Sequence, residues 1–188
     1  AGIAAGHNRV SDFNSPNPEG FGYYHFNIRN GRRESSYTAF LKGVESRQNL
    51  TVKTGLEVSR IIFSNNNAVG VEVSKGSKIS QIRAEAEVIL AGGAIGSPTI
   101  LLRSGIGPAN DLTRIGIKPK LDSPNVGKNL QDHVLVRVSH KTSSSVSLHK
   151  LTRIDLASIS FLRALVFGTG PMNVFPLEAG AYMRGPGA

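Results

Sequence analysis

The chain contains no cysteine and no tryptophan among its 188 residues. Without cysteine, disulfides, thiolate metal sites and cysteine nucleophiles are all excluded. It also lacks any apolar run close to the roughly 18 residues that a membrane helix needs, so we expect no membrane span. The first ten residues, AGIAAGHNRV, show neither an initiating methionine nor the basic-then-apolar pattern of a secretory signal. We therefore expect the chain to begin inside a longer one.

Acidic residues are scarce, because 13 Asp and Glu stand against 22 Lys and Arg, which gives a formal net charge of +9. Such a balance suits an anionic partner, for example nucleic acid. The basic residues are nevertheless spread along the chain, and the longest unbroken run is Arg32-Arg33. This spread favours a solvated surface over a nucleic-acid site. Hydrophobic residues make up 39% of the chain, which is enough for a folded core.

The five histidines do not form a recognisable site. Four of them lack the spacing of metal ligands, so we predict no metal site; they are His7, His25, His140 and His149. His133 follows Asp132, but adjacent residues in a loop rarely point the same way. We therefore assign no catalytic role to this pair.

Short β patterns separated by turn clusters dominate the middle of the chain. They predict a β meander with strands at Leu50–Thr54, Val58–Phe63, Val69–Val73, Lys78–Arg83 and Val88–Ala91. Before the meander, the aromatic run Phe21–Ile28 predicts a strand. Within Arg33–Ser46 a short helix is expected, capped by Ser35 or Ser36.

The stretch after residue 87 predicts a strand, a glycine turn and a helix. Val88–Ala91 is apolar throughout, as in a central parallel strand. Gly92-Gly93 then permits unusual dihedral angles and close approach of a ligand. Ser97 as N-cap and Pro98 as first helical residue predict a helix over Thr99–Ser104, ended by Gly105.

Ligands of open α/β sheets bind at strand ends and helix N-termini, which is where this turn is expected. The glycines lack G-x-G-x-x-G spacing, however. From the residues alone, nucleotide contact and a purely structural tight turn both remain open.

Several segments together resemble the glucose-methanol-choline (GMC) oxidoreductases. GAIGSPTILLRSGIGP is similar to the second signature of that family, in which a small-residue turn, Ser-Pro, an aliphatic stretch and Ser-Gly-Ile-Gly-Pro follow in order. The other similar segments occur in the family's order and are NGRRESSYTAFL (30–41), EVSRIIF (57–63), AVGVEV (68–73) and PNVGKNLQDHV (124–134). Residues 22–26 and 30–33 resemble the choline-dehydrogenase-like bacterial members.

The resemblance implies an α/β fold, α+β overall. Residues 1–134 would form part of a Rossmann-like FAD-binding domain with a β meander, and residues 135–188 would begin a substrate domain built on an antiparallel sheet. FAD is the implied cofactor. The family's adenine contact matches the main chain of Val58, and its adenosine-side turn matches Ala91, Gly92 and Gly93. A main chain offers one donor and one acceptor, which is enough to read an adenine edge.

The implied reaction oxidises the CH–OH group of a small-molecule alcohol by hydride transfer to the flavin, assisted by a histidine. The resemblance places that histidine after Ala188 and the pyrophosphate-binding glycines before Ala1. We therefore expect no catalytic residue within the chain and no activity from the chain alone. Two alternatives remain: a non-catalytic basic module that binds nucleic acid or another polyanion, and a lyase on the same flavoprotein scaffold.

Beyond residue 134 the patterns are weaker. Leu135–Lys141 predicts a strand that enters the substrate domain. Ile154–Phe167 is rich in apolar residues and predicts a helix. This helix is interpreted as a buried core helix, with a lid beside the substrate cleft as the alternative.

Overall fold

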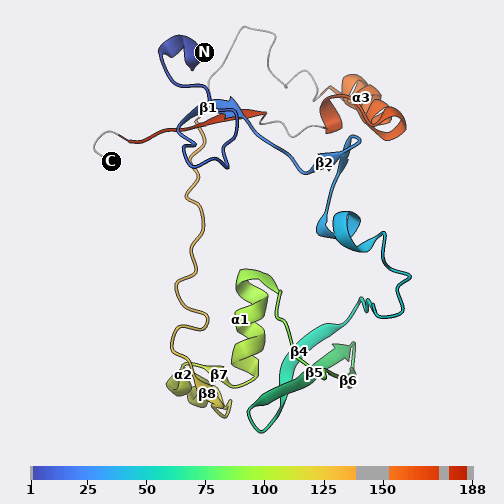
Figure 1. Ribbon diagram of the computed structural model, residues 1–188, viewed down its shortest axis with the longest axis vertical. Coiled ribbons are helices and arrows are strands. Elements are labelled where there is room, and N and C mark those ends of the chain that lie inside the picture. Colours follow the sequence, from blue (N-terminus) through green and yellow to red (C-terminus); the bar gives the residue numbers. More distant parts are fainter. Residues whose placement is uncertain (1, 139–152, 174–177, 186–188) are drawn as a thin grey trace. The chain divides into compact units, whose positions relative to one another are not determined.

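The computed structural model describes residues 2–138, 153–173 and 178–185 (Figure 1). The chain divides into two compact units, Ala1–Leu50 with Ser139–Ala188, and Thr51–Val138. These units are defined by contacts and not by what they bind. The expected division at residue 134 between a cofactor domain and a substrate domain therefore stays a prediction.

The second unit is built on the β meander. β4 (Glu57–Ser64), β5 (Asn67–Lys75) and β6 (Lys78–Arg83) form an antiparallel sheet in the order β4-β5-β6. The turns use Asn65 at φ +52° and Gly76 at φ +59°, because asparagine and glycine tolerate positive φ. The three predicted strands are confirmed, each within a few residues of its expected bounds.

Two further strands expected in this unit are absent. Leu50–Thr54 and Val88–Ala91 pair with no strand among the described residues. Ile89 is 77% exposed, so the prediction of a central buried strand is wrong for this structure. An apolar segment becomes a buried strand only where neighbouring strands flank it, and no described segment flanks this one. Leu135–Val138 also forms no strand, and the rest of that expected strand lies outside the described residues.

α1 (Gly93–Arg103) begins four residues before Ser97, so the expected N-cap and first turn are wrong. Gly92 is the N-cap, and the Ser97 hydroxyl accepts the Gly92 N–H at 2.8 Å from inside the helix. Pro98 lies in the second turn. The end of the helix is confirmed, because Gly105 leaves it at φ +83°.

A small parallel pair follows α1. β7 (Ile106–Gly107) pairs with β8 (Leu121–Asp122), and α2 (Ala109–Arg114) lies between them in the sequence. A Cβ on Gly107 would lie 2.4 Å from Leu102 Cδ2, so α1 packs closely against β7. Leu112 is only 1% exposed and forms the local core of this segment.

The first unit contains shorter elements. η1 (Ile3–Ala5) precedes β1 (Gly20–Tyr23), which pairs antiparallel with β9 (Ala179–Tyr182). β2 (Ile28–Arg29) and β3 (Arg32–Arg33) form a hairpin. The strand expected over Phe21–Ile28 is therefore confirmed only at its start, in β1.

The helix expected within Arg33–Ser46 is a single π-helical segment, η2 (Tyr37–Leu41), followed by turns. Ser35 provides the expected cap. Its hydroxyl accepts the Thr38 N–H at 3.2 Å, while Thr38 Oγ1 accepts the Ser35 N–H at 2.7 Å. These reciprocal bonds satisfy two main-chain donors at the start of the segment.

α3 (Ile154–Phe167) has the bounds expected from the sequence and ends at Gly168 with φ +64°. It is followed by η4 (Pro171–Asn173). The expectation of a buried core helix is wrong within the described residues, because no residue of α3 is buried and Ile154 is 85% exposed. Among the described elements η4 is the main neighbour of α3, so most of its apolar side chains have no described element packed against them.

Candidate adenosine site

The open edge of β4 is the first part of the candidate site. β5 lies on one side of β4, and no strand among the described residues lies on the other. Residues of an antiparallel strand point their N–H and C=O alternately toward the neighbouring strand and away from it. The Ile61 N–H points away, since it donates to the Ser104 hydroxyl at 2.8 Å. Main-chain groups at this edge are therefore available to partners other than β5.

A β-bulge decides which other residue faces the open edge. Val58 lies opposite Val73 and Arg60 opposite Glu72, so Ser59 is an extra residue. The main-chain N–H and C=O of Glu72, the partner of Arg60, point toward β4. Those of Val73, the next residue along, point away from β4. Its partner Val58 consequently directs its own N–H and C=O to the open edge.

The Val58 main chain has no hydrogen-bond partner beyond its own sheet within residues 2–138, 153–173 and 178–185. Its side chain is half-buried. Val58 therefore packs through its side chain and leaves its main-chain N–H and C=O free. One donor and one acceptor side by side suit the edge of a purine base.

The turn before α1 is the second part of the candidate site. Gly93 has φ +78°, a conformation that strains most residues with a Cβ. A Cβ on Gly92 would lie 3.1 Å from the Ser97 nitrogen, so the chain passes close to the first helical turn. Ala91, Gly92 and Gly93 are all exposed. The first N–H groups of α1 have no acceptor within the helix, and the positive end of its dipole lies here.

Two contacts hold α1 against β4. Besides the bond between Ser104 and Ile61, Arg103 Nη1 lies 3.3 Å from Glu57 Oε1. In Figure 1 both elements run downward in the view, with β4 inclined to α1. The start of α1 and the start of β4 therefore lie on the same side of these contacts.

The distance of each part from the bond between Ser104 and Ile61 follows from standard geometry. α1 rises about 16 Å from Ser104 back to Gly93, at about 1.5 Å per residue. β4 extends about 10 Å from Ile61 back to Val58, at about 3.3 Å per residue. The glycine turn and Val58 thus lie about 16 Å along α1 and about 10 Å along β4 from the bond that joins Ser104 and Ile61.

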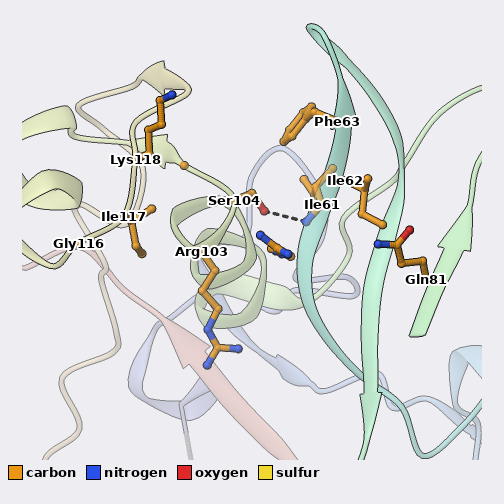
Figure 2. A pocket seen from close by; sticks show the side chains of 11 residues that line it. Ile61, Ile62, Phe63, Gln81, Arg103, Ser104, Gly116, Ile117 and Lys118 are labelled. Atoms are coloured by element: carbon orange, nitrogen blue, oxygen red, sulfur yellow. Dashed lines mark hydrogen bonds between the residues drawn. The ribbon is translucent and has the colours of Figure 1, made fainter. Parts of the chain in front are cut away.

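Two cavities border α1. One of about 510 Å³ lies between β4, the end of α1 and residues 116–118. Figure 2 shows the Ser104 hydroxyl and the Ile61 N–H facing each other beside this cavity. The second, of about 590 Å³, lies along another face of α1 and is lined by residues that include Ala94, Ile95 and the loop 125–131. The second cavity starts one residue beyond Gly93, so space for a ligand adjoins the glycine turn.

An ion pair stabilises the strand next to the bulge. Arg60 donates from Nε to Glu72 Oε1 at 3.1 Å and from Nη2 to Oε2 at 2.8 Å. These hydrogen bonds lower the pKa of the Glu72 carboxyl, desolvation opposes them, and the charge of Arg60 adds a further, smaller lowering. They also raise the pKa of Arg60. The pair spans β4 and β5 at the position where Ser59 is inserted.

The groups present fit the adenosine part of a flavin nucleotide. The open edge supplies a main-chain donor and acceptor. The glycine turn supplies close approach without a side chain in the way, beside the first N–H groups of α1, while the Gly92 N–H itself is held by the Ser97 hydroxyl. Recognition of this kind depends on the main chain and requires no acidic or basic side chain.

His133 and Asp132 do not form a catalytic arrangement. Their side chains are almost fully exposed, and His133 Nδ1 lies 3.7 Å from Asp132 Oδ1. In the part of the chain that the structure describes, no group of three or more metal-ligating side chains is close enough to hold an ion. No helix among the described residues is long and apolar enough to cross a membrane.

Two residues of the site escaped the sequence analysis. Ser59 appears there only as one residue of a β pattern, although it creates the bulge, and Ser104 only as the last residue of a helix. A serine directly before the Gly-Ile-Gly stop is a signal for Ser104, because such a hydroxyl can reach back to the helix or across to a neighbour. No sequence signal locates the bulge.

The comparisons with known proteins agree with one another. The family model described as "GMC oxidoreductase" matches residues 1–135. An oxygen-dependent choline dehydrogenase of Brucella anthropi is 39% identical over 186 residues, which cover 98% of this chain and 33% of that protein. The chain thus spans about a third of the length of this relative.

Solved structures show the same fold. Pyridoxine 4-oxidase from Mesorbium loti is 35% identical with a TM-score of 0.61, and the match covers 65% of this chain and 24% of that one. A variant of formate oxidase from Aspergillus oryzae has a TM-score of 0.83 at 24% identity and covers 97% of this chain and 32% of that one. At that identity the likeness concerns the fold alone, and it confirms the expected α/β class.

Proposed function

Because this chain belongs to the GMC oxidoreductase family, we propose that it forms the adenosine-binding part of an FAD-dependent oxidoreductase. The substrate of the whole protein is a small alcohol of the choline class, as the name of the Brucella anthropi relative suggests. The flavin, when bound, accepts the hydride that leaves the CH–OH carbon. The residues described here bind and orient the cofactor rather than move a proton.

The observation that carries the proposal is the free main chain of Val58 at the open edge of β4, on the same side as the Gly92-Gly93 turn. In this proposal the Val58 N–H donates to a ring nitrogen of adenine, and its C=O accepts from the exocyclic amine. Ala91, Gly92 and Gly93 approach the ribose side of the nucleotide. No charged side chain is required for these contacts.

A chimera provides the test. Residues 1–188 replace the matching third of the Brucella anthropi choline dehydrogenase, which restores both flanks; we call this protein the completed chimera. We expect it to purify with FAD and to oxidise choline or a related alcohol with reduction of the flavin. A colourless protein that does not take up added FAD would contradict the proposal.

A second assay tests whether the chain itself acts on the alcohol. The isolated chain carries no residue proposed to act on the alcohol, so we expect it to be inactive under the same assay. Turnover of an alcohol by the isolated chain would show that a catalytic group has been overlooked.

A further inference from the structure

We propose that Ser104 is a positioning residue, whose hydroxyl fixes β4 against α1 at the spacing that lets Val58 and the Gly92-Gly93 turn contact one adenosine. The inference rests on the proposed function, because the spacing matters only where both parts bind the same ligand. Ser104 does not itself touch the nucleotide in this account.

The Ser104 hydroxyl makes two hydrogen bonds with opposite roles. It donates to the Ile100 C=O at 2.6 Å, which directs the oxygen, and it accepts the Ile61 N–H at 2.8 Å. The first bond lies within α1 and the second joins segments 43 residues apart. Because both sides of the hydroxyl are occupied, its orientation is determined.

The acceptor is needed because Ile61 is buried. Ile61 is 8% exposed, so its N–H has little access to water. A buried main-chain donor without a partner is costly, and such groups are almost always paired in folded proteins. Loss of the Ser104 hydroxyl would therefore favour a shift of β4 relative to α1, since the N–H gains by reaching solvent.

The second link between the two elements cannot replace the first. Arg103 and Glu57 lie 3.3 Å apart, but their side chains are 51% and 71% exposed. Exposed ion pairs contribute little and are screened by salt. Val58 is three residues from Ile61 on the same strand, so a movement of the strand at Ile61 displaces the Val58 main chain as well.

The test uses the completed chimera with Ser104→Ala and a matched control, Thr99→Ala. The Thr99 hydroxyl also donates to a carbonyl one turn back, at 2.7 Å from Ile95 O, but within the described ranges it links α1 to no other element. Hydrogen exchange of the peptide containing Ile61 and the dissociation constant for FAD are both measured. Ser104→Ala should exchange faster at Ile61 and bind FAD more weakly, each on the order of tenfold. Thr99→Ala should leave both close to wild type.

Two more variants keep the inference falsifiable. Ser104→Thr retains the hydroxyl and should bind FAD as wild type does. Ser104→Cys keeps the side-chain volume but offers a weaker acceptor, so it should bind FAD less tightly than wild type. The cysteine variant therefore tests the hydroxyl even if Ser104→Ala does not fold. Wild-type affinity in the Cys variant, or equal losses in Ser104→Ala and Thr99→Ala, would overturn the inference.

Failure of the proposed function has a different signature. In that case the wild-type chimera does not bind FAD at all, although exchange at Ile61 still responds to Ser104→Ala. That result would overturn the positioning role together with the site. Wild-type binding combined with unchanged binding in Ser104→Ala would overturn the positioning role alone.

Discussion

Replacing Val58 by proline removes one hydrogen-bond donor from the candidate site. The register of β4 directs the Val58 N–H away from β5, so the sheet loses no ladder bond. Proline is tolerated on edge strands where the missing N–H faces outward. The substitution therefore tests the main chain of this residue, which ordinary side-chain changes leave intact.

The expected loss follows from the value of one hydrogen bond. A net contribution of about 1 kcal/mol corresponds to about fivefold weaker binding. Displacement of the neighbouring C=O by the proline ring would add to this loss. We therefore expect the FAD dissociation constant of the Val58→Pro chimera to rise at least about fivefold.

The matched control is Ile79→Pro on β6, the opposite edge of the same sheet. Ile79 lies opposite Ser74 on β5, and the main-chain groups of Ser74 point toward its other partner, Glu57 on β4. The Ile79 N–H therefore receives no partner from Ser74 and also points outward. Both variants carry a proline at an outward edge position, and both are assayed by titration of the flavin-free chimera with FAD. Equal affinities in the two variants would refute the role of the Val58 main chain.

Three further outcomes follow from the same structure. Gly93→Ala should lower the melting temperature, because φ +78° costs an L-residue about 1 kcal/mol or more. Gly96→Ala, in open space within α1, should not lower it, and a lower melting temperature for Gly96→Ala alone would contradict this reasoning. Since Arg60 lowers the pKa of Glu72 in the folded state, the pair stabilises the fold above the ordinary pKa range of glutamate and loses this effect as pH falls through the lowered pKa. Glu72→Gln should therefore reduce the loss of stability on acidification, measured as unfolding free energy against pH, and an unchanged acid loss would count against the pair. Leu112→Ala should cost about 3 kcal/mol of unfolding free energy in denaturant titrations, whereas Ile115→Ala, at a residue that is 65% exposed, should cost much less. Similar losses of unfolding free energy in the two variants would disprove the assigned core.

Local chemistry explains which elements could be predicted. The meander follows from alternating apolar residues and from turns that need asparagine or glycine, and both signals lie within a few residues of each other. The end of α1 at Gly105 is local in the same way. The start of α1 differs from the expectation because Ser97-Pro98 is a strong local start signal, whereas in the structure the Ser97 hydroxyl accepts the Gly92 N–H from inside the helix.

The remaining features depend on partners far along the chain. Val88–Ala91 has the composition of a buried strand, but burial requires neighbours that the pattern itself does not supply. The position of Val58 could be assigned only through a resemblance, and the reason that its main chain is free is the insertion of Ser59 into the register. The bond between Ser104 and Ile61 joins two segments that no periodicity relates.

The most direct test of the central claim is competition between FAD and ADP for the flavin-free completed chimera. ADP contains the adenosine half of the cofactor and lacks the reactive ring. If the Val58 main chain and the Gly92-Gly93 turn hold that half, ADP displaces FAD with a single site per protein. FAD binding that is indifferent to saturating ADP, or no FAD binding at all, would contradict the account.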